Sequence, residues 1–237
     1  MAHRQIRGRI LYTSKKPEIL DKKRGEEHFI FVHHENGRRT LTAHCEIYEP
    51  EPVVIRDVVH SFDAANRPLD AFVRLTVGGS FMGAGFFRMS GETIECESYG
   101  PAIGRVSQTF DTEGPYAWFG THPLSADAFN TLNFDRSEGP AKRRMRSFLS
   151  SLDHRGASPP MISTHHIFLK YIGDEEITVA AGTFQTRHFQ FVGESEDPEG
   201  HPPYDLWVTA DDDSILVLAQ VTGYMKTHYE LIELERD

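Results

Sequence analysis

The segment from Ile177 to Phe191, ITVAAGTFQTRHFQF, constrains the fold more than any other part of this 237-residue chain. Two apolar-rich arms flank a short connection, Ala181-Gly182-Thr183, in which glycine allows the backbone to reverse direction. β-Branched and aromatic residues dominate both arms. The pattern predicts a β-hairpin, and therefore antiparallel strand pairing in this part of the chain.

Strict alternation of apolar and polar residues marks two more strands, Leu41–Ile47 and Leu69–Val77. Turn signals such as Asn36-Gly37 and Gly78-Gly79 separate further strand-like runs. Before the middle of the chain these runs are 8–13, 28–34, 53–62, 81–89, 92–99 and 104–110; after it they are 165–171, 177–180, 184–192, 204–209, 215–221 and 225–234. Their regular spacing predicts an antiparallel meander.

Residues 112–160 lack this regular spacing of strand-like runs and are predicted to form an irregular or helical cap inserted into the domain. The best helix candidate is Pro140–Leu152, in which Met145, Phe148 and Leu149 share one helical face. The acidic segment from Glu194 to Pro203, rich in proline and glycine, is predicted to be an exposed hairpin loop.

A dozen antiparallel strands cannot stay flat without exposing edges and one bare apolar face. We therefore predict a single all-β domain over residues 1–237: a strongly curved antiparallel sheet, as barrel, half-barrel or sandwich, with one short helical insertion. Whether its interior is filled with side chains or left hollow for a ligand determines which functions it can have.

The C-terminal third combines the ITVAAGTFQTRHFQF hairpin, the LWVTADDDSILVLAQV strand pair and a closing Tyr229-Glu230-Leu231 strand. In these features it resembles the bacterial family of unknown function DUF3108. The resemblance implies a curved antiparallel sheet similar to that of lipoprotein carriers, which hold lipid in a half-open barrel. It implies no catalytic residues.

Charge and hydropathy exclude several classes of protein. The formal net charge of −10 opposes binding to nucleic acid, and the one basic run, Lys142–Arg144 with Arg146, is interpreted as a solvated surface. No stretch is apolar enough to cross a bilayer, and the N-terminal residues contain no apolar signal core, so we expect a cytoplasmic protein without membrane insertion. Cys45 and Cys96 are expected to be reduced core residues.

Polar side chains alternate along three predicted strands and could line the interior. Tyr224, Lys226 and His228 form one such row, His44 and Tyr48 belong to a second, and Arg56 with His60 form a third. Each row would instead be an ordinary solvated face if its strand pointed the other way.

Two further places could contact a ligand. Arg74, two residues from Phe72, could bind an anion through its guanidinium, or could pair with Asp70. The loop from Tyr116 to Pro123 contains Trp118 and His122, and its aromatic residues would form either a plug at the end of the barrel or a lid over a ligand.

No cofactor and no resident metal are expected. The chain has 13 histidines but no His-x-His pair, and adjacent histidines on a strand point to opposite faces. Glycines 78–85 lack a phosphate-loop spacing and predict a bulged hairpin, while Asp211–Asp213 predicts a turn rather than a calcium loop.

The favoured hypothesis is binding of a small, mostly apolar, aromatic or lipid-like metabolite with an acidic or phenolic end. Its candidate ligand contacts are Arg74, Phe72, Tyr48, Lys226, Trp118 and His122. The alternative is a cofactor-independent lyase, isomerase or hydrolase with His44, His60, His228 and Tyr224 as candidate catalytic residues. A structural or regulatory protein with a filled core is the third, and the sequence leaves homodimerisation open.

Overall fold

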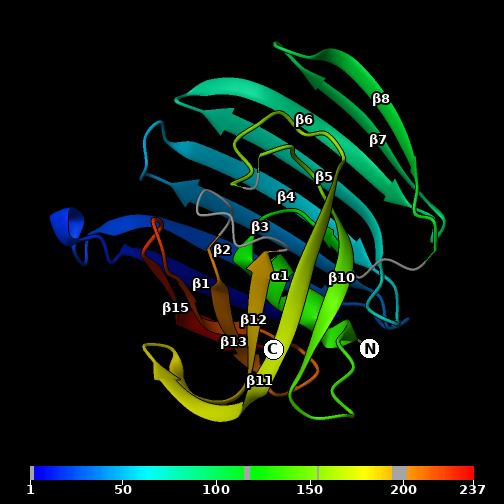
Figure 1. The fold of residues 1–237 in the computed structure, drawn as a ribbon. Helices are drawn as coiled ribbons and strands as arrows, with labels where there is room; N and C mark the ends of the chain where they lie inside the picture. Colours follow the sequence, from blue (N-terminus) through cyan, green and yellow to red (C-terminus); the bar gives the residue numbers. More distant parts are fainter. Residues whose placement is uncertain (1–2, 115–117, 154, 194–201) are drawn as a thin grey trace.

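One 15-stranded sheet contains every strand of the described chain (Figure 1). The computed structural model describes residues 3–114, 118–153, 155–193 and 202–237. The N-terminal strands are β1 (Arg4–Ser14), β2 (Lys23–His33), β3 (Arg39–Ile47), β4 (Val54–Phe62), β5 (Pro68–Val77), β6 (Ser80–Met89), β7 (Thr93–Gly100) and β8 (Gly104–Asp111). The C-terminal strands are β9 (Trp118–Gly120), β10 (Ala141–Leu149), β11 (Ser163–Val179), β12 (Gly182–Gly193), β13 (Tyr204–Thr209), β14 (Leu216–Val221) and β15 (Thr227–Arg236). Three short helices complete the described elements: η1 (Pro17–Ile19), α1 (Leu124–Asn130) and η2 (Thr131–Asn133).

The order of strands places the two ends of the chain in the centre of the sheet. β1 pairs with β15, β1 to β8 extend to one edge, and β14 back to β9 extend to the other. Neighbours are antiparallel except β9 and β10, which are parallel. The predicted all-β curved antiparallel sheet with one short helical insertion is confirmed.

The predicted hairpin Ile177–Phe191 forms from β11 and β12, where Ile177 pairs with Phe184. Val179 pairs with Gly182, so the turn consists of Ala180 and Ala181, one residue earlier than predicted. The predicted strands 165–171 and 177–180 are one continuous strand, β11, with a register shift between Tyr171 and Gly173. Such bulges increase the local twist and help the sheet to curve.

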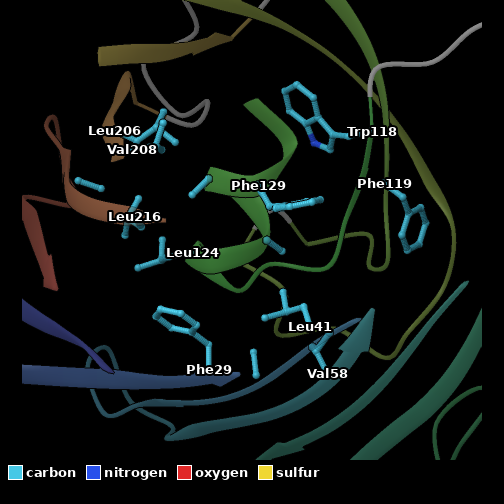
Figure 2. Packing of buried hydrophobic residues seen from close by; sticks show 14 of the residues in the cluster. Phe29, Leu41, Val58, Trp118, Phe119, Leu124, Phe129, Leu206, Val208 and Leu216 are labelled. Atoms are coloured by element: carbon cyan, nitrogen blue, oxygen red, sulfur yellow. The ribbon is translucent and has the colours of Figure 1, made fainter. Parts of the chain in front are cut away.

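Helix α1 lies inside the curved sheet, between its two walls (Figure 2). The helix lies between Leu206, Val208 and Leu216 on one side and Phe29, Leu41 and Val58 on the other. The Phe129 ring of α1 packs against Phe31 and Phe62 of the N-terminal wall. All seven helical residues except Asp127 are buried. The helix is therefore part of the hydrophobic core that the sheet encloses.

Buried polar groups hold both ends of α1. The Glu27 carboxylate of β2 accepts hydrogen bonds from the backbone N–H groups of Leu124 (2.7 Å) and Ser125 (3.0 Å). At the other end, the Ser214 hydroxyl donates to the carbonyl of Ala128 at 3.0 Å. Because Glu27 and Ser214 belong to opposite halves of the sheet, the helix links the two walls.

The helix predicted in Pro140–Leu152 is wrong, because Ala141–Leu149 forms strand β10. β10 pairs with β11 on one side and β9 on the other, and this strand pairing outweighs the helical spacing of its apolar residues. The segment 112–160 thus supplies the only α-helix of the described residues, as an interior element, together with two strands of the sheet.

The aromatic loop contributes to the core. Trp118 and Phe119 are 3% and 0% exposed, so this part of the loop plugs the interior. Tyr116 and Ala117 lie outside the described residues, as do residues 194–201 of the predicted acidic loop.

Three further local predictions are confirmed. Cys45 and Cys96 are buried free thiols, and the glycine-rich segment forms the β5–β6 hairpin with a register shift between Leu75 and Thr76. Asp211–Asp213 lies in the turn between β13 and β14. No helix in the described part of the chain is long and apolar enough to cross a membrane.

Candidate functional site

An interior cavity of about 230 Å³ lies where the β1–β5 wall meets α1. Its apolar lining comes from strands on both sides of the β1–β15 junction and from the helix: Tyr12, Ile47, Val54, Leu124, Val221 and Tyr229. The exposed residues Glu51 and Arg155 stand at its mouth. Apolar walls with a few charged groups are the usual composition of a small-molecule site.

Two buried arginines also line this cavity. Arg24 is 6% exposed, and its Nε and Nη2 donate to the carbonyl of Glu49 at 3.0 and 2.7 Å. Its Nη1 is buried and has no hydrogen-bond partner among the described residues. Since an unpaired buried donor is costly, Arg24 retains a donor that a ligand could use.

Arg56 is 2% exposed and forms no ion pair with any carboxylate that the structure describes. Its Nη2 donates to the carbonyls of Arg155 and Gly156, both at 3.0 Å, and its Nε is buried without a partner in the described residues. A buried guanidinium that lacks a counter-ion favours the binding of an anion.

Gly156 makes this position of Arg56 possible. Its φ is +69°, in the left-handed region, and a Cβ there would lie 2.5 Å from Arg56 Nη2 and 2.7 Å from the His122 ring. His122 lines the same cavity, and its Nε2 lies 2.7 Å from the Ser151 hydroxyl oxygen. The chain therefore packs a glycine loop, an arginine and a histidine tightly at one wall.

Asp127 is the polar residue that α1 presents to the cavity. Burial, together with a smaller contribution from the nearby charge of Glu27, raises the pKa of its carboxyl to about 7, and the charge of Arg56 opposes this shift. Near neutral pH this carboxyl can therefore be neutral or charged. The charge of the cavity consequently varies with pH.

Two of the three predicted polar rows face outward. His44 and Tyr48 lie on the outer surface, where His44 Nδ1 is 2.7 Å from Asp57 Oδ1 and the Tyr48 hydroxyl donates to Glu46. The hydrogen bond to Asp57 raises the pKa of His44, and the bond to Glu46 raises that of Tyr48 to about 12.

The C-terminal row is also outside. His228 alternates with buried Thr227 and Tyr229 and pairs with Glu230 at 3.6 Å, with its pKa lowered mainly by burial. Lys226 occupies a turn with φ +40°, and Tyr224 is 48% exposed. None of these three residues is part of the cavity lining.

Arg74 and Phe72 lie on the outer face of β5, where Phe72 is 40% exposed. Arg74 Nη1 donates to the Thr76 hydroxyl at 3.1 Å and lies 4.0 Å from Asp57, so its carboxylate neighbour is Asp57 and not Asp70, which was one of the two alternatives for this side chain. Neither residue lines the cavity.

The third row does face inward. His60 is fully buried beside Phe62 and Phe119, and burial alone lowers its pKa to about 3, so it is neutral and a weak base. Trp118 packs edge-on against Phe191 in the core. Of the candidate catalytic residues and ligand contacts, only His122 lines the cavity, together with Arg56 of the third predicted row.

Part of this site had a signal in the sequence. Arg56 is in phase with Val54 and Val58, and Glu27 is in phase with Phe29 and Phe31, so each puts a charge on a buried strand face. Arg24 is out of phase, because the register shifts between Tyr12 and Thr13 opposite it.

Among the comparisons with known proteins, the one with solved structures gives information about the fold. No protein-family model and no curated protein matches the chain. A crystal structure of a β-barrel-like protein of the domain of unknown function DUF1849 from Brucella abortus aligns with 100% of this chain and 98% of that one, at TM-score 0.61 and 12% identity. A DUF1089 family protein from Pseudomonas aeruginosa aligns with 83% of this chain and 88% of that one, at TM-score 0.44 and 8% identity.

The DUF1849 protein has the same architecture as this chain, and a sequence identity of 12% shows a similarity of fold alone. The resemblance of the C-terminal third to DUF3108 in particular has no matching family model. The chain therefore adopts a β-barrel-like fold that it shares with a bacterial protein of unknown function.

Proposed function

We propose that this protein binds a small, mostly apolar molecule with an anionic end in the cavity between the β1–β5 wall and α1. The observation that supports the proposal is the pair of buried arginines, Arg24 and Arg56, which line a largely apolar cavity and each have a donor without a partner among the described residues. The anionic group would take these donors, and the apolar body would contact residues such as Tyr12, Leu124 and Tyr229.

The cavity volume limits the size of the ligand. A cavity of about 150 Å³ accommodates benzene, so about 230 Å³ suits a body roughly one and a half times as large. Aromatic and short aliphatic carboxylates are of this size. A longer tail would have to leave through the mouth beside Glu51 and Arg155.

A panel of carboxylates tests the proposal directly. Benzoate, phenylpropanoate and straight-chain monocarboxylates are compared with their amides and alcohols by thermal shift, and affinities follow from isothermal titration calorimetry. We expect stabilisation by at least one acid and markedly weaker binding of its amide, because only the acid supplies the charge that Arg56 lacks.

Two variants locate the binding. Arg24→Gln removes a donor from the cavity and should weaken binding of the acid by about 10- to 150-fold, the range for a hydrogen bond to a charged group. Arg74→Gln removes an arginine of the outer face and is the matched control, with no expected change. Binding of no acid in the panel, or equal losses in both variants, would contradict the proposal.

Asp127 supports a second candidate function, proton transfer on the bound molecule. A half-buried carboxyl whose pKa is about 7 is suited to act as a general acid or base at neutral pH. Any acid that binds is incubated with the wild type and with Asp127→Asn, and products are sought by mass spectrometry. Turnover that the variant loses supports catalysis, whereas an unaltered ligand leaves binding as the function.

A further inference from the structure

The two edges of the sheet differ in how they are protected. β9, at one edge, has only three residues, and all of them are buried. β8, at the other edge, has eight residues, pairs only with β7, and shows no register shift against it. In Figure 1, β8 is the outermost strand at the end of the N-terminal half.

Exposed edges usually carry features that prevent pairing with another chain. Lysine, proline, bulges and short length are the common ones. The sequence of β8, GRVSQTFD, contains no lysine and no proline, and its alternation is regular. The backbone N–H and C=O groups on its free side are therefore available for a further antiparallel strand.

The β8 sequence is complementary to itself. In a continuous sheet the inner faces of two copies stay on the same side, so opposed residues must both be even-numbered or both odd-numbered. With Gln108 opposite Gln108 of the partner subunit, Arg105 faces Asp111 of the partner subunit on the outer side, and Val106 faces Phe110 of the partner subunit on the inner side.

Neighbouring registers lose this match. A shift that centres Ser107 puts Arg105 opposite threonine and leaves Asp111 beyond the pairing, and a shift that centres Thr109 puts Phe110 opposite Gln108. Among the residues that the structure describes, Arg105 forms one long ion pair, at 3.7 Å to Glu97, and its side chain is 83% exposed, so it can form a closer pair with another carboxylate. Asp111 is exposed as well.

We propose that two copies of this protein pair through their β8 strands, antiparallel about Gln108, with reciprocal Arg105–Asp111 ion pairs across the interface. The partner is a second copy because the charge pattern of this strand fits its own reverse. The pairing leaves the ligand cavity untouched, since that lies at the β1–β5 wall. The proposal is thus independent of the proposed function.

Charge reversal tests both the interface and its register. The full chain is measured by sedimentation velocity from micromolar to millimolar concentration, with light scattering for the mass. We expect a reversible monomer–dimer equilibrium in the wild type. Arg105→Asp or Asp111→Arg places like charges opposite each other and should raise the dimer Kd by about ten-fold or more.

The double variant Arg105→Asp/Asp111→Arg restores opposite charges only in this register, and we expect it to dimerise like the wild type. Arg38→Asp, in the β2–β3 turn, makes the same charge change away from β8 and should leave the Kd unchanged. Thermal unfolding confirms that each variant is folded. A wild type that is monomeric throughout, single variants that dimerise normally, or a double variant that stays monomeric would each overturn the proposal.

Discussion

Replacing Asp127 with asparagine should remove a pH dependence of stability that the wild type shows between pH 6 and pH 8. Burial raises the pKa of this carboxyl to about 7 in the folded protein, against an ordinary value of 3.8. Over this range the folded state holds a proton that the unfolded state has lost. Protonation therefore stabilises the folded state at low pH, and this contribution disappears as the pH rises through 7.

The size of the effect follows from the two pKa values. Proton binding by a group with a folded pKa of about 7 contributes about 1.4 kcal/mol at pH 6, about 0.4 kcal/mol at pH 7 and about 0.1 kcal/mol at pH 8. The free energy of unfolding of the wild type, minus that of Asp127→Asn, should thus fall by about 1.3 kcal/mol from pH 6 to pH 8.

Urea unfolding at several pH values measures this difference. His60 acts in the opposite direction, because its folded pKa is about 3 and its unfolded pKa about 6.5. It is present in both proteins, so it cancels in the difference. Asp212→Asn, which changes an exposed carboxylate in the β13–β14 turn, is the control and should keep the wild-type slope.

Parallel stability curves for the wild type and Asp127→Asn over this range would refute the reasoning. They would mean that the carboxyl is ionised in the folded protein at pH 6, and that the cavity is more polar than its lining indicates. The affinity for a carboxylate ligand, measured for both proteins over the same pH range, extends the test. Ionised Asp127 should repel the ligand, so affinity should fall above pH 7 in the wild type but not in Asp127→Asn.

Three further substitutions probe the residues around the cavity. Gly156→Ala should lower the free energy of unfolding and weaken binding of the carboxylate, because its Cβ would displace Arg56. Gly139→Ala is the control: Gly139 has a similar φ of +77° but nothing within 4 Å of a Cβ, so this substitution should strain the backbone and leave binding unchanged. Glu27→Gln should cost about 1–3 kcal/mol in urea unfolding, because an amide cannot accept all the hydrogen bonds from Tyr12, Leu124 and Ser125, while Glu46→Gln on the outer face should cost far less. At pH 5 His60 should lower the free energy of unfolding of the wild type by about 2 kcal/mol, because the unfolded histidine binds a proton there and the folded one, with its pKa of about 3, does not. His60→Phe should remove this loss, and equal acid sensitivity of the two proteins in urea unfolding would contradict the prediction.

The curvature and class of the fold could be predicted because strands are encoded locally. Alternation in segments such as Leu41–Ile47 and Leu69–Val77 reports which side of each strand is buried, without reference to any other segment. The hairpin Ile177–Phe191 could be predicted for the same reason, since its two strands are neighbours in the sequence and are joined by a two-residue turn.

Which polar residues meet could not be predicted, because the cavity gathers residues that are far apart in the sequence. Arg24, Arg56, Asp127 and Gly156 come together only after β1 has paired with β15 and α1 has entered the sheet. Alternation does separate the rows: His44 and His228 lie opposite buried residues such as Cys45 and Tyr229, whereas Arg56 and His60 share the buried face of β4 with Val58.

The amino-acid sequence by itself determined that this chain is a curved antiparallel sheet, since period-two burial and turn residues act between neighbours in the chain. Only the tertiary structure decided that Ala141–Leu149 is a strand, because β9 and β11 supply its hydrogen bonds. It likewise decided that Arg24 turns inward, because a register shift between two paired strands reverses the phase of a side chain, and such a shift is a property of the pair.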